Sequence, residues 1–156
     1  MTYTVPRART VLLTCALAGL TALWLALAQR PELRVNGRVV NPRVAPFVTA
    51  DEHLFLPVRG IARRVGGRIE VVPAKREVIL IRGRTVVRFR IGDRFANLDG
   101  RAIPLSRAPF VLHGRTMVDA AIISRAFAVH VAYEKARNRV DILTPGLNFQ
   151  SVAKPR

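Results

Sequence analysis

Residues 45–48 (APFV) recur at 108–111, an offset of 63 residues (108 − 45). When the comparison is extended outward from these tetrapeptides, apolar positions stay in step on both sides. Downstream the offset becomes 62, so that Ile61 aligns with Ile123 (123 − 61). Self-similarity at a fixed period over this length indicates two copies of one structural unit.

Each predicted unit carries the same order of local signals. It opens with a hairpin turn, at Asn36-Gly37 in the first unit and at Asp99-Gly100 in the second. Both central residues of such a turn need positive φ, which Asn, Asp and Gly adopt more readily than other residues. The proline in each APFV segment (Pro46 and Pro109) predicts a short extended stretch, since the residue before proline avoids the helical region. A helix follows, with Pro57 in its first position in one unit and Asp119 as N-cap in the other.

The apolar pattern predicts which faces are buried. In the first helix the apolar stripe is Val58, Ile61, Ala62 and Val65, ended by Gly66-Gly67, and in the second it is Ala120, Ile123 and Phe127. Closing hairpins are expected for 68–72 with 77–81 and for 129–133 with 139–143. Residues 84–91 (RTVVRFRI) alternate between apolar and basic side chains, which predicts a half-buried antiparallel strand.

These elements define the fold class as α+β, an antiparallel β-sheet with two short helices, built from two pseudo-symmetric repeats. The repeats span 34–83 and 97–144 within a single domain of 33–144. One domain is expected because each unit alone is too small to bury a sufficient core.

Residues 1–28 read as an export signal. Two arginines precede the uncharged apolar stretch 11–28, and residues 26–28 (ALA) place small residues where a signal peptidase cleaves. An uncleaved membrane anchor is the alternative, because 18 apolar residues reach the lower limit for a span. In both cases the expected location is secreted or extracytoplasmic. Residues 145–156 are expected to form a flexible tail.

The charge is strongly basic, with 26 Lys and Arg against 10 Asp and Glu, a net charge of +16. Without the two arginines of residues 1–28, 24 basic residues remain against 10 acidic ones, a net charge of +14. Such a surface attracts polyanions. A compositional bias toward arginine is the competing explanation, because the arginines form no single block in the sequence.

The motifs resemble the copper amine oxidase N-terminal-like domain, also called the stalk domain, over about residues 33–144. The resemblance rests on short motifs in order: VNGR at 35–38, APFV at 45–48, LPVR at 56–59, and VGG at 65–67. Its motif residues are Asn36, Gly37, Pro46, Phe47, Pro57, Arg59, Gly66, Gly67, Pro109 and Phe110. In the second unit GRTMV (114–118) matches, but VDAA at 118–121 replaces the expected Pro-x-Arg step.

The resemblance implies an accessory module that is not itself catalytic and that carries no cofactor. Similar domains occur in exported bacterial proteins, where they are associated with the cell envelope. The residues agree with a non-enzymatic role. His53, His113 and His130 have no metal-ligand spacing, so no metal site is expected. The serines occur in no nucleophile motif, and Glu70 and Glu77 are expected to form surface ion pairs with nearby arginines.

Arg84, Arg88 and Arg90 form the candidate polyanion-binding site, with Arg82 and Arg94 as possible extensions. Same-face residues of a strand stand about 7 Å apart, a spacing suited to a charged polymer. The expected partner is a cell-wall polymer or an anionic membrane surface. Nucleic acid is disfavoured, since no aromatic side chains alternate with the arginines for base stacking. The alternative is a protein-interaction module that docks an envelope enzyme.

Overall fold

The computed structural model describes residues 30–146, so the predicted signal segment and residues 147–156 of the predicted tail lie outside the described residues. Three sheets and two short α-helices make up this region. Sheet A has the strand order β12 (His130–Glu134), β13 (Arg139–Leu143), β1 (Glu32–Val35), β2 (Arg38–Val40). Sheet B has the order β10 (Phe110–Leu112), β11 (Arg115–Asp119), β4 (Leu54–Pro57), β3 (Phe47–Val48). Sheet C has the order β5 (Arg68–Val72), β6 (Glu77–Arg82), β7 (Thr85–Arg90), β8 (Phe95–Leu98), β9 (Arg101–Pro104).

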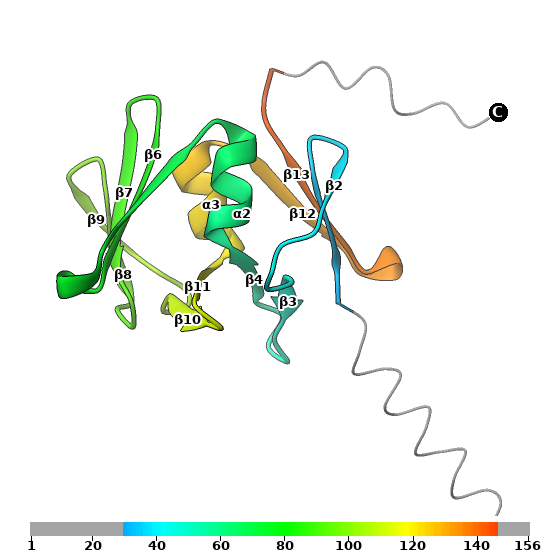
Figure 1. Cartoon of the computed structure of the whole chain (residues 1–156), viewed down its shortest axis with the longest axis horizontal. Helices are drawn as coiled ribbons and strands as arrows, with labels where there is room; N and C mark the ends of the chain where they lie inside the picture. Colours follow the sequence, from blue (N-terminus) through cyan, green and yellow to red (C-terminus); the bar gives the residue numbers. More distant parts are fainter. Residues whose placement is uncertain (1–29, 147–156) are drawn as a thin grey trace, which may run out of the picture.

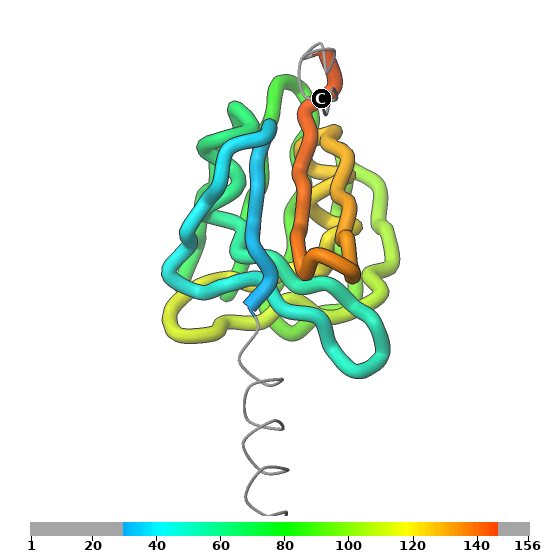
Figure 2. The backbone as a smooth tube through the Cα atoms, turned by 90° about the vertical axis from the view of Figure 1, so that its right-hand side faces the viewer, coloured from blue at the N-terminus to red at the C-terminus, as the bar shows by residue number. Residues whose placement is uncertain are grey.

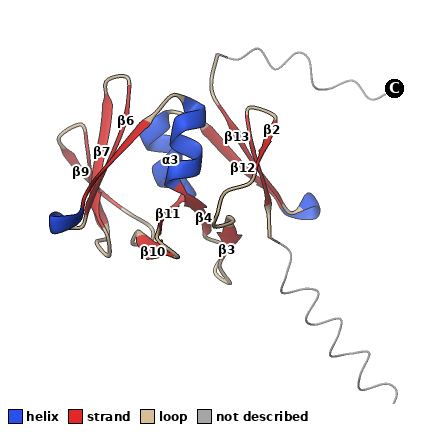
Figure 3. Ribbon diagram, viewed as in Figure 1, coloured by secondary structure: helices blue, strands red, loops and turns tan. Residues whose placement is uncertain are grey.

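The two helices lie between sheets A and C, and sheet B closes one end of the layer (Figures 1 and 3). They are α2 (Val58–Ala62), which continues into the 3-10 turn η1 (Arg63–Val65), and α3 (Ala120–Phe127). Helix α3 contacts strands of both sheets, β6 and β7 on one side and β12 on the other. All strand pairs are antiparallel except β1 with β13. The predicted α+β class, antiparallel sheet with two short helices, is therefore confirmed.

Each outer sheet combines hairpins that are distant in the sequence. In sheet A the first hairpin, β1–β2, joins the last one, β12–β13, and β1 runs beside β13 in Figure 2. Asn36 fixes this junction, since its side-chain amide donates to Thr144 Oγ1 at 3.2 Å and its Oδ1 accepts from Thr144 N at 2.8 Å. In sheet B, Leu56 of β4 pairs with Val118 of β11. That the two halves are copies of one unit stays a prediction.

The predicted helix faces form the core. Val58, Ile61, Ala62 and Val65 are all buried, as are Ile123 and Phe127 of α3. Asp119 caps α3 as expected, with its Oδ1 accepting from Ala121 N at 2.8 Å. Gly66 ends η1 in the left-handed conformation, with φ of 73°. Gly67 is needed for a different reason, because a Cβ there would lie 2.4 Å from Cε1 of Phe127.

A second, smaller apolar cluster lies on the other face of sheet B. Its rings are Phe47, Phe55 and Phe110, with centroid separations between 5.0 and 6.2 Å. Phe47 and Phe110, the motif residues of the two APFV segments, are half-buried and pack in this cluster with Met117 and Val44. They therefore pack on sheet B and do not belong to the core around the helices.

Three local expectations need correction. Pro57 is the N-cap of α2, with extended backbone at φ of −76° and ψ of 111°, and the helix begins at Val58. The last hairpin is shifted by one residue at its start, because β12 begins at His130 instead of Val129. Glu70 and Glu77 do not form the expected ion pairs among the described residues. Across the hairpin Glu70 lies opposite Ile79, and Glu77 lies opposite Val72. The strand register therefore keeps the two carboxylates from facing each other.

Candidate functional site

The three arginines singled out from the sequence lie along β7, the middle strand of sheet C, and the turn that precedes it. Arg88 and Arg90 are exposed on β7, while Val87 and Phe89 between them are buried. Arg84 is exposed in the turn before the strand. None of the three takes part in an ion pair within residues 30–146. The alternation predicted for this strand is therefore present, and its basic side chains face solvent.

Acidic side chains share the same face of sheet C. A shallow groove of about 680 Å³ over β6 to β9 is lined by Arg88 and Arg90, but also by Glu77, Asp93 and Asp99. Glu77 lies directly opposite Arg90 across β6 and β7. Because nearby carboxylates offset the guanidinium charges, the groove does not present a purely positive surface to a polymer.

A second group of arginines gathers around α2. A depression of about 360 Å³, here called the α2 pocket, is lined by Pro42, Arg43, Val44, Pro57, Arg59, Gly60, Arg63, Arg64 and Arg115. These five arginines come from three places: the loop after β2, helix α2 with η1, and the start of β11. The lining includes no acidic residue.

The backbone around the α2 pocket is held by buried neighbours. Val44 is buried in the aromatic cluster beside Arg43. Pro57 and Val58 are buried at the start of α2, and Gly60 lies close to Pro42, whose Cβ would be 3.5 Å from a Cβ at that glycine. Arg64 bends back along the helix, where its Nη1 donates to Gly60 O at 2.9 Å. The arginines therefore project from anchored positions.

The location of the acidic residues explains why these arginines form no ion pair within residues 30–146. All ten acidic residues of the chain fall within the described region. Five form ion pairs elsewhere, namely Glu32, Asp51, Glu52, Glu134 and Asp141, and a sixth, Asp119, is bonded to His53 and to the first turn of α3. The other four, Glu70, Glu77, Asp93 and Asp99, belong to sheet C or its turns. None of these ten side-chain carboxylates lines the α2 pocket.

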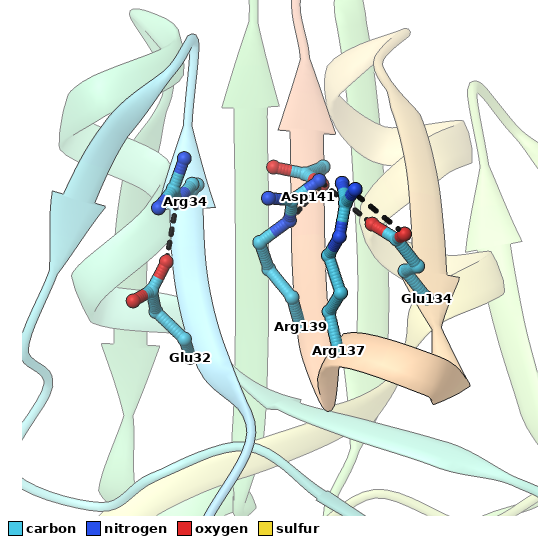
Figure 4. A network of polar contacts seen from close by, with 6 residues as sticks. All are labelled: Glu32, Arg34, Glu134, Arg137, Arg139 and Asp141. Atoms are coloured by element: carbon cyan, nitrogen blue, oxygen red, sulfur yellow. Dashed lines mark hydrogen bonds and ion pairs between the residues drawn. The ribbon is translucent and has the colours of Figure 1, made fainter.

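Sheet A shows the opposite arrangement. Arg139 Nη2 donates to Glu134 Oε2 at 2.7 Å and Arg139 Nε donates to Asp141 Oδ2 at 2.8 Å, while Arg137 reaches Glu134 at 3.4 Å (Figure 4). On the adjacent strand Arg34 pairs with Glu32 (Figure 4). The parallel register sets Glu32 beside Arg139 and Arg34 beside Asp141, so the charges alternate across the two strands.

The three histidines lie in different settings. His53 Nδ1 is 2.9 Å from Asp119 Oδ2, which links the loop before β4 to the cap of α3. His113 is in the β10–β11 turn with φ of 45°, and His130 is exposed on β12. Within residues 30–146 no three His, Cys, Asp or Glu side chains gather as a metal site would require. The described part of the chain also contains no helix long and apolar enough to cross a bilayer.

Comparison with known families now adds to this geometry. A model of the copper amine oxidase N-terminal domain matches residues 34–142, and the chain belongs to that family. The predicted resemblance is thereby confirmed. In copper amine oxidases this N-terminal domain is not the catalytic domain, and the fold described here fits a module of that kind. A search of curated proteins finds no match to the chain.

Proposed function

We propose that this protein is an exported, non-catalytic module that attaches to an anionic component of the cell envelope, either a wall polymer or a membrane surface. The family supports a non-catalytic domain, and the apolar stretch at 11–28 supports export. The observation that carries the proposal is the set of arginines that face solvent without acidic partners. Arginine is well suited to this task because its planar guanidinium donates paired hydrogen bonds to phosphate and carboxylate groups.

Because 24 basic residues face 10 acidic ones outside residues 1–28, some arginines stay unpaired whatever the origin of the excess, and their position is the informative feature. Ion pairs offset the arginines of sheet A and acidic side chains share the groove of Arg88 and Arg90, whereas the arginines of the α2 pocket form no ion pair among the described residues. Arg84, Arg88 and Arg90 remain part of the proposed contact surface, since all three are exposed.

The test is co-sedimentation of the full chain with purified wall sacculi and with vesicles of anionic phospholipid, over a series of salt concentrations. Binding that falls steeply with salt supports the proposal, because salt screens exposed charges. Sacculi and vesicles separate the two kinds of envelope partner. Absence of binding to both at low salt would reject it. A chain with Arg84, Arg88 and Arg90 all changed to Glu shows whether the β7 surface contributes.

A protein-docking role is the second proposal, and one feature favours it. Val71 and Val111 are 45% and 54% exposed and line the same groove, together with Ile91, Pro109 and Phe110. Two exposed valines in one groove fit a contact with an apolar segment of another envelope protein. This role predicts a specific co-purifying protein and weak dependence on salt, which distinguishes it from attachment to a polyanion.

A further inference from the structure

We infer that the α2 pocket is a binding site for a phosphate group, in the form of a phosphate ester or a pyrophosphate. The inference rests on the proposed function in one respect, namely that the group belongs to an envelope component. It names the chemical group that is recognised and the place where it binds, which is separate from the β7 surface on sheet C.

The α2 pocket offers a large number of hydrogen-bond donors. Each guanidinium offers five N–H donors, and five arginines line the pocket. A carboxylate carries one charge and has two oxygens, which in Glu134 are already shared between Arg137 and Arg139. A phosphate monoester or a pyrophosphate has three or more non-bridging oxygens and carries about two or more charges, so it accepts paired hydrogen bonds from more guanidiniums at once. The pocket volume of about 360 Å³ lies at the small end of the range for small-molecule sites, which suits a headgroup-sized ligand.

Like charges also lie close together in the α2 pocket. Arg59 and Arg63 are four residues apart along α2 and η1, and Arg64 follows directly. Like charges at this spacing destabilise a helix. No acid lines the pocket to relieve the repulsion, although the same chain provides acids for the arginines of sheet A. A cluster of like charges without acidic neighbours lowers stability. Proteins retain such unfavourable arrangements mainly at functional sites, so the cluster indicates a binding site.

The tertiary fold brings the arginines of the α2 pocket together. Arg115 begins β11, which pairs with β4 just ahead of α2. Arg115 is half-buried, whereas Arg43, Arg59, Arg63 and Arg64 are exposed. The pocket therefore has an anchored arginine on one wall and four reachable ones around it. This geometry allows a bound anion to be contacted from several sides.

The experiment is calorimetric titration of the full chain, kept in solution with a non-ionic detergent, using inorganic pyrophosphate as the probe. The pocket variant is Arg59→Gln with Arg63→Gln. Its matched control is Arg38→Gln with Arg101→Gln, which removes the same charge from exposed positions outside both the α2 pocket and the β7 surface. We expect the pocket variant to lose affinity by about tenfold or more, since each charge-assisted hydrogen bond contributes at least that factor, and the control to keep it.

A charge-conserving variant separates geometry from net charge. Arg59→Lys with Arg63→Lys keeps both charges but removes the paired donors, so we expect an intermediate affinity. Equal losses in the pocket variant and the matched control would overturn the inference, because they would show that only total charge matters. Unchanged affinity in the pocket variant would overturn it as well.

Sedimentation of the same proteins distinguishes this inference from the proposed function. Sacculi with and without their phosphate polymer, and vesicles with phosphatidylglycerol or phosphatidylcholine, identify whether the phosphate comes from the wall or the lipid. If the chain sediments but the pocket variant sediments equally well, the pocket inference fails and envelope attachment stands. If pyrophosphate binds at the pocket but nothing sediments, the pocket stands and envelope attachment fails.

Discussion

The arginines of sheet A and those of the α2 pocket belong to one chain but differ in their surroundings. Arg139 is held between Glu134 and Asp141, with its side chain only 22% exposed. Arg59 and Arg63 are exposed and lie in a pocket without acids. The difference shows that the positive charge of this protein is not uniform: in one region it contributes to holding strands together, and in another it is left available for an anion.

The largest expected effect concerns the packing that holds α2 in place. Gly67→Ala sets a methyl group against the ring of the buried Phe127, so we expect a loss of about 1–3 kcal/mol in the free energy of unfolding. Gly60→Ala, within α2 itself, is the control, because its Cβ would meet only Pro42 at an ordinary contact distance of 3.5 Å. Urea denaturation measures both. Equal stability of the two variants would mean that α2 is not fixed by this contact.

The next largest effect concerns the ion pairs of sheet A. Arg139→Ala leaves Glu134 and Asp141 without their shared partner, and we expect a loss of about 1–2 kcal/mol for this partly buried pair of contacts. Arg88→Ala on sheet C, where no ion pair is lost, is expected to change stability little. A result in which Arg88→Ala destabilises the protein as much as Arg139→Ala would show that the ion pairs of sheet A contribute nothing of their own.

The smallest effect has the opposite sign. Arg63→Gln removes a like-charge neighbour of Arg59 on the same helical stretch, so we expect a gain of about 0.2–0.5 kcal/mol. Measurement at low salt is needed, because salt screens the repulsion that the change removes. A loss of stability at low salt would indicate that Arg63 makes a favourable contact and would weaken the contrast with sheet A.

Much of the fold follows from local signals in the sequence. Asn36-Gly37 and Asp99-Gly100 adopt the positive φ angles that their hairpin turns require. Asp119 caps α3, and the apolar stripe of α2 is buried. These features depend on neighbours in the sequence, which is why periodicity and turn chemistry predict them.

The pairing of the outer sheets and the α2 pocket depend instead on contacts between distant residues. No local pattern places β13 beside β1, or Arg115 near Arg43 and Arg59. The sequence directed attention to the regular arginine spacing on β7, but it gave no sign that Glu77, Asp93 and Asp99 share that face. The sequence likewise contains no sign that Arg59, Arg63 and Arg64 meet Arg43 and Arg115 in one pocket, because this meeting depends on the tertiary fold.

The most direct test of the account compares the two regions in one binding measurement. The full chain is sedimented with phosphate-bearing sacculi over a salt series as the unmodified protein, as Arg59→Gln with Arg63→Gln, and as Arg34→Gln with Arg137→Gln. We expect the pocket variant to bind more weakly. We also expect the slope of log K against log salt to become shallower by about two, one for each lost contact. The sheet A variant, which loses the same charge from paired positions, is expected to behave like the unmodified protein, and equal weakening of both variants would contradict the account.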